Sequence, residues 1–144
     1  MANITRREVI VGAGGALLSP ALPALAEAPM RMRALYNPDM SFSPLAAARN
    51  GQTVLFNGFM APLLRAISRF FVLTKRPMAV CPFCESEADW PDDIIAVYTK
   101  RIVTMVPFNV RIQVRGTLTL GAYTDPATKF VSRLRLTKAS FYRI

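Results

Sequence analysis

Hydrophobic and polar residues alternate along several short segments of the chain, as they do in β-strands with one buried face. The clearest alternation begins at Val110, where Ile112 and Val114 fall on one side and Arg111 and Arg115 on the other. Other segments are apolar enough to lie at the centre of a sheet. The expected strands span residues 53–60, 69–73, 94–98, 110–120 and 131–142.

Five strands within about 90 residues predict an all-β domain. Two of the strands are long and contain glycine bends, so we expect a small five-stranded OB-like barrel. Gly58 is expected to mark a bulge or a sharp bend in the first strand, and residues 125–128 form a turn between the last two. A β-sandwich is the alternative arrangement.

One short helix is expected before the strands. Ser43 is typical of a helix N-cap and Pro44 of the first turn, while Asn50 and Gly51 are typical of a helix end. Residues 27–42 show no clear period and are expected to form an extended lead-in.

The N-terminal residues 1–26 have the features of a cleavable signal peptide. Arg6 and Arg7 precede the apolar residues 9–18, and a small-residue end follows at residues 24–26. The arginine pair resembles the twin-arginine motif, and the mildly hydrophobic, glycine-rich core suits that export route. An ordinary secretory signal is the alternative. The prediction is a periplasmic protein with a lead-in at 27–52 and a barrel domain at 53–144.

The absence of histidine limits the chemistry open to this chain. Of its 144 residues none is histidine, which excludes Ser-His-Asp and Cys-His catalysis and removes the commonest metal ligand. Neighbouring carboxylates such as Glu87 and Asp89 have no other polar catalytic groups near them in the sequence. We therefore expect a protein that is not an enzyme.

Positive charge dominates the rest of the chain. Removing Arg6, Arg7 and Glu8 with the signal leaves 16 basic and 8 acidic residues. The basic strand faces lack the interleaved aromatic residues that stack on bases, so nucleic acid is not the expected partner. An anionic membrane surface, an acidic protein or solvent is expected to face them instead. The residues on these faces are Arg111, Arg115, Arg133, Arg135 and Lys138.

The segment between the second and third strands combines both cysteines with a cluster of acids. Cys81 and Cys84 have the Cys-x-x-Cys spacing that chelates zinc or a softer ion such as Cu(I). With no histidine and no second cysteine pair, carboxylates must complete such a site. The candidate completing ligands are Glu85, Glu87 and Asp89, with Asp92 and Asp93 behind them and the Met78 thioether for Cu(I).

Two other interpretations of the cysteine pair stay open. Cys81 would be the attacking thiolate of a thiol–disulfide redox protein, although the nearby carboxylates oppose thiolate formation. A disulfide between Cys81 and Cys84 would instead pin the segment in an exported interaction module.

Several stretches together resemble a known protein family. They are Phe56-Asn57-Gly58-Phe59-Met60-Ala61-Pro62, then Phe70–Leu73, then the cysteine segment and Val110–Gly116. They are similar to small exported bacterial proteins of poorly defined function, often encoded beside ABC transporters of the lipoprotein-release or macrolide-exporter type. Some of these gene neighbourhoods are linked to zinc or other metal supply.

The family resemblance implies an accessory protein that binds or delivers metal, working with a membrane ABC transporter. The commoner family form has one cysteine followed by a histidine, whereas here Cys84 and the acids occupy that place. The expected function is therefore an exported, non-enzymatic metal carrier that uses the cysteine segment.

Overall fold

The computed structural model describes residues 15, 27–63, 65–79 and 91–144. Two short helical elements precede five strands over these residues. Their bounds are η1 (Met32–Leu35), α1 (Pro44–Arg49), β1 (Thr53–Met60), β2 (Phe70–Thr74), β3 (Ile94–Thr99), β4 (Arg111–Thr124) and β5 (Val131–Arg143). The five predicted strands and the predicted helix are confirmed, although β4 continues to Thr124 instead of ending at residue 120.

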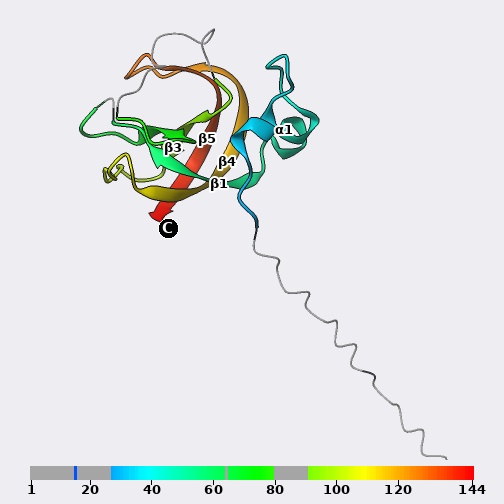
Figure 1. The fold of residues 1–144 in the computed structure, drawn as a ribbon, viewed down its shortest axis with the longest axis horizontal. Helices are drawn as coiled ribbons and strands as arrows, with labels where there is room; N and C mark the ends of the chain where they lie inside the picture. Colours follow the sequence, from blue (N-terminus) through cyan, green and yellow to red (C-terminus); the bar gives the residue numbers. More distant parts are fainter. Residues whose placement is uncertain (1–14, 16–26, 64, 80–90) are drawn as a thin grey trace, which may run out of the picture.

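The five strands form one closed sheet in the order β1-β2-β3-β5-β4, with β4 returning to pair with β1 (Figure 1). Neighbouring strands run antiparallel except for β3 and β5, which are parallel. The predicted all-β class is confirmed. The sandwich alternative is wrong, because the described strands make a single sheet and not two.

The strand pattern fills the barrel interior with apolar side chains. On β4, Ile112 and Val114 are fully buried, and Leu134 and Leu136 of β5 face the same interior. Arg111 and Arg115 lie on the exposed side, as the alternation predicted. The aromatic residues Phe56, Phe70 and Phe71 belong to the core, whereas Phe59 is only partly buried.

The lead-in packs against the barrel and is not simply extended. Met30 N–H donates to the carbonyl of Leu55 at 2.8 Å, which lays the segment beside β1. The next residues form η1, and in this turn the side chains of Met32 and Leu35 are buried. Burial of these apolar side chains stabilises the turn. Helix α1 follows outside the barrel (Figure 1). The lead-in therefore contributes side chains to the core of the molecule.

Candidate functional site

The five predicted metal ligands, Cys81, Cys84, Glu85, Glu87 and Asp89, lie outside the described residues, as do most residues of the predicted signal. The structure does place both ends of the cysteine segment. Strand β2 ends at Thr74 and β3 begins at Ile94, and these two residues are paired. Lys75 N–H then donates to the Asp93 carbonyl at 3.0 Å. The segment therefore leaves and re-enters the barrel at one point between adjacent strands.

Two adjacent aspartates close the cysteine segment and have different surroundings. The Asp92 carboxylate forms an ion pair with Arg33 of η1, with 3.1 Å between Nε and Oδ2. The Asp93 Oδ1 atom is buried and has no hydrogen-bond partner among the described residues. A buried carboxylate oxygen without a donor is unfavourable unless a cation balances it. Asp93 is thus the acid of this pair that has free capacity to bind a cation.

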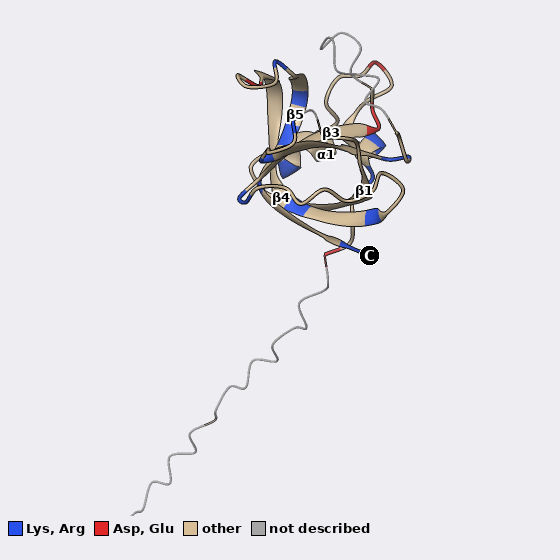
Figure 2. Cartoon of the chain, turned by 90° about the vertical axis from the view of Figure 1, so that its left-hand side faces the viewer, with Lys and Arg blue, Asp and Glu red and all other residues tan. Residues whose placement is uncertain are grey.

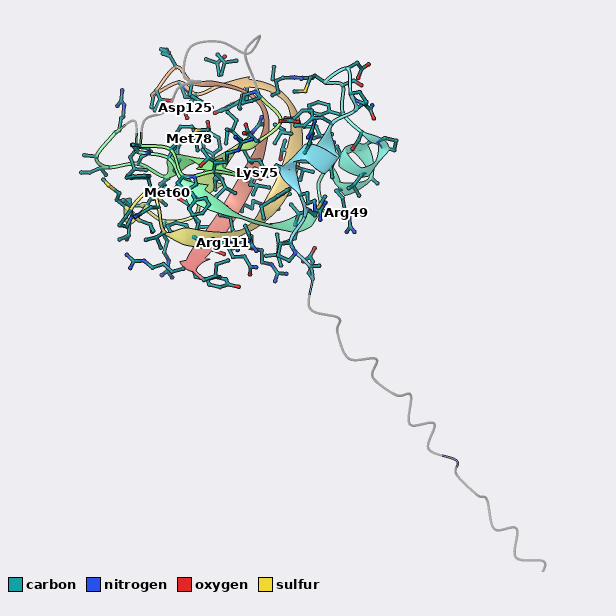
Figure 3. All side chains as sticks on the ribbon, viewed as in Figure 1. Arg49, Met60, Lys75, Met78, Arg111 and Asp125 are labelled. Carbon is teal, nitrogen blue, oxygen red and sulfur yellow. The ribbon has the colours of Figure 1, made fainter. Side chains whose placement is uncertain are left out.

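A basic groove of about 830 Å³ opens beside the ends of this segment. Four of its lining side chains are cationic and none is acidic. Its floor includes Gly58 and the partly buried Phe59 of β1. The cationic residues are Arg31, Arg33, Lys75 and Arg111, of which Figure 3 labels the last two.

The sequence did not predict this groove. Only Arg111 was singled out, as part of a strand face. The other cations come from the lead-in and from the end of β2, and no local spacing links these segments before the barrel brings them together.

The predicted basic strand faces are partly used inside the fold. Arg133 donates to the Met40 carbonyl at 2.7 Å, and its guanidinium lies 5.1 Å from the Phe42 ring. Arg135 stacks 4.3 Å above the Tyr123 ring. Cation–π contacts of this kind hold the side chains in place. These two arginines therefore stabilise the packing of β5, while Arg111 and Arg115 stay exposed.

A polar pair of a buried aspartate and a half-buried tyrosine lies at the opposite end of β3 from the cysteine segment. Tyr98 hydroxyl donates to Asp125 Oδ2 at 3.0 Å, and Asp125 is 7% exposed. Burial raises the pKa of Tyr98, and the hydrogen bond to the Asp125 carboxylate raises it further. The Tyr98 hydroxyl therefore stays protonated and acts as a structural donor.

Across the described ranges, no group of three histidine, cysteine, aspartate or glutamate side chains is arranged to hold a metal ion. No helix found there is long and apolar enough to cross a membrane.

The chain matches no protein-family model and no curated protein. Among solved structures, it is similar to a DUF3299 family protein from Pseudomonas aeruginosa PAO1, determined by crystallography at 2.45 Å resolution. The two share 17% sequence identity over 78% of this chain and 74% of the other, with a TM-score of 0.48. Similarity at this level carries no information about activity.

Proposed function

We propose that this protein is an exported, non-enzymatic metal-binding protein, with Cys81 and Cys84 as its thiolate ligands. Thiolates at this spacing suit zinc or Cu(I), and carboxylates complete the ligand set. Glu85, Glu87 and Asp89 are the nearest in sequence. The family resemblance adds a membrane ABC transporter as the receiver of the metal.

The surroundings of the Asp93 carboxylate support this proposal. Its buried Oδ1 has no donor within the described structure and lies where the cysteine segment rejoins β3. A cation bound by the segment would supply the missing charge. Asp92 differs because its carboxylate already forms an ion pair with Arg33. The two neighbours therefore provide a matched pair for a test.

We infer in addition that the barrel is of the OB type. The strand number, the closed order β1-β2-β3-β5-β4 and the parallel β3–β5 pairing support this type. In such barrels the face of the second and third strands, with the loops between strands one and two and between strands four and five, carries the binding groups. The cysteine segment joins β2 and β3, the two strands of that face.

Titration of the reduced full-length protein with Zn²⁺, followed by calorimetry, tests the metal site. We expect about one equivalent to bind, and Cys81→Ser to abolish uptake. Asp93→Asn is expected to weaken binding by about tenfold or more, while Asp92→Asn changes it little because Arg33 already neutralises that carboxylate. Cu(I), titrated in the same way with a competing chelator, distinguishes the two metals.

Absence of uptake of either ion under reducing conditions would contradict the proposal. Disulfide-reductase activity without metal binding would assign the cysteines to thiol–disulfide exchange. Equal effects of Asp93→Asn and Asp92→Asn would remove Asp93 from the ligand set but leave the cysteines in it.

A further inference from the structure

The most exposed large apolar side chains of the described structure include three on two neighbouring loops. Ile67, between β1 and β2, is 77% exposed. Ile102 and Met105, between β3 and β4, are 58% and 61% exposed. Side chains this exposed project from the surface, and clustered apolar groups of this kind mark interaction sites.

Backbone hydrogen bonds join the two loops into one surface. Val103 N–H donates to the Ser68 carbonyl at 2.8 Å, and Thr99 N–H donates to the Arg69 carbonyl at 2.8 Å. The Thr99 hydroxyl reaches the same carbonyl at 3.1 Å. Within the second loop, the side chains of Val103 and Val106 are buried. The hydrogen bonds and the buried valines therefore hold the backbone that carries Ile67, Ile102 and Met105.

The two loops that hold these apolar side chains also hold exposed cations. Arg69, Lys100 and Arg101 are exposed and come from the same two loops. Residues 94–124 contain no acid, and the whole of 94–144 holds nine basic residues against the single acid Asp125. Asp125 is buried, and its carboxylate is occupied by its own turn and by Tyr98. Figure 2 shows basic positions recurring along β4 and β5.

We propose that this two-loop patch (Ile67, Ile102, Met105, Arg69, Lys100 and Arg101) docks the protein on an anionic phospholipid membrane. The apolar side chains enter the boundary between headgroups and acyl chains, and the cations contact lipid phosphates. Exposed apolar side chains on loops that also carry exposed Arg and Lys suit this interface. The proposal does not depend on the metal site.

A second copy of the chain suits the patch less well. A symmetric dimer would bring the same cationic loops of two copies face to face, and like charges repel. The full chain also has a formal net charge of +9, which opposes self-association. A negatively charged lipid surface satisfies both the apolar and the cationic members.

Co-sedimentation of the full-length protein with vesicles tests the proposal. The vesicles are phosphatidylcholine alone, or phosphatidylcholine with about one-third phosphatidylglycerol. We expect binding to the anionic vesicles to fall at least about tenfold in the triple variant Ile67→Ser, Ile102→Ser, Met105→Ser. Neutralising Arg69, Lys100 and Arg101 to Gln should lower it by about fivefold for each cation, with little effect on phosphatidylcholine alone.

Leu45 provides the matched control. It is 40% exposed on α1, which lies on the other side of the barrel from the yellow β3–β4 loop (Figure 1). Leu45→Ser should leave vesicle binding unchanged. Brominated lipid should quench the added fluorescence of Ile102→Trp but not that of Leu45→Trp, which reports insertion of this loop specifically. Melting curves of all variants should match the parent.

Equal vesicle binding by the parent and the apolar triple variant would overturn the proposal. Loss of binding in the charge variant alone would show that the protein adsorbs to the headgroups by charge, without insertion of the apolar side chains, and would overturn it too. Concentration-dependent dimerisation without lipid, abolished by the apolar triple variant, would assign the patch to a second copy.

Discussion

At the scale of single residues, Asp125 has the most completely occupied carboxylate described. Oδ1 accepts hydrogen bonds from the N–H groups of Ala127 and Thr128 and from the Thr128 hydroxyl, and Oδ2 accepts one from Tyr98. Burial by itself would raise the pKa of Asp125, but the hydrogen bonds from Thr128, Tyr98 and Ala127 outweigh it and lower that pKa. The sequence predicted a turn at residues 125–128 but not the distant tyrosine partner.

The lowered pKa of Asp125 makes the stability of the fold depend on acid. A carboxylate with a lower pKa in the folded state stabilises the fold above its unfolded pKa of about 3.9. That contribution is lost as the pH falls through the folded-state pKa. We expect Asp125→Asn to lower the free energy of unfolding by about 2 kcal/mol near neutral pH. The difference from the parent should shrink below about pH 4, which urea denaturation at several pH values measures. A difference that grows on acidification would contradict this assignment.

At the scale of secondary-structure elements, Ser43 shows what a local pattern predicts and what it omits. The predicted N-cap is confirmed, since its hydroxyl oxygen accepts from the Ala46 N–H at 3.2 Å. The same hydroxyl donates to the Ala34 carbonyl at 2.7 Å, and so joins α1 to η1. No sequence rule predicts this second bond, because it depends on how the lead-in folds back.

Ser43→Ala should therefore loosen two elements together. We expect the free energy of unfolding to fall by about 1–2 kcal/mol, because a helix cap is lost together with a second, part-buried hydrogen bond. Denaturant unfolding measures this, with the exposed Ser140→Ala of β5 as the control. Hydrogen exchange should accelerate at the Ala46 and Ser43 amides and stay unchanged on β4. A change under about 0.5 kcal/mol would show that neither bond contributes.

At the scale of the whole molecule, the sequence predicts elements better than it predicts their neighbours. Alternation located the strands with one buried face, such as β4, and continuous apolar runs located strands such as β2, which is buried along its whole length. Arg31, Arg33, Lys75 and Arg111 meet only when β1 pairs with both β2 and β4, so the basic groove has no local signature. The two-loop patch is likewise joined by hydrogen bonds between segments about 30 residues apart. Pairing between strands therefore creates both surfaces: β1 with β2 and β4 for the groove, and β2 with β3 for the patch.

The close approach of β1 to β2 depends on Gly58, for a reason different from the one expected from the sequence. Of the expected bulge or sharp bend at Gly58, the bulge is wrong, because β1 pairs with β4 in unbroken register through Gly58 and Phe59, and the bend stays a prediction. The glycine instead permits a close approach to β2: an added Cβ would lie 2.5 Å from the Thr74 carbonyl oxygen. The contact between β1 and β2, here called the β1–β2 seam, is short. Its strand pairing covers Phe59 and Met60, and the Ala61 N–H extends it by one hydrogen bond to the Val72 carbonyl.

Gly58→Ala should open this seam first. The new methyl must displace backbone, not the flexible end of a side chain, so we expect the free energy of unfolding to fall by about 1–3 kcal/mol. Hydrogen exchange at the Ala61 amide, which donates to the Val72 carbonyl at 2.9 Å across the seam, should accelerate more than exchange between β4 and β5. Thr53→Ala, at the exposed start of the same strand, is the control. Uniform acceleration over all strands would show that the β1–β2 seam opens only with the whole barrel.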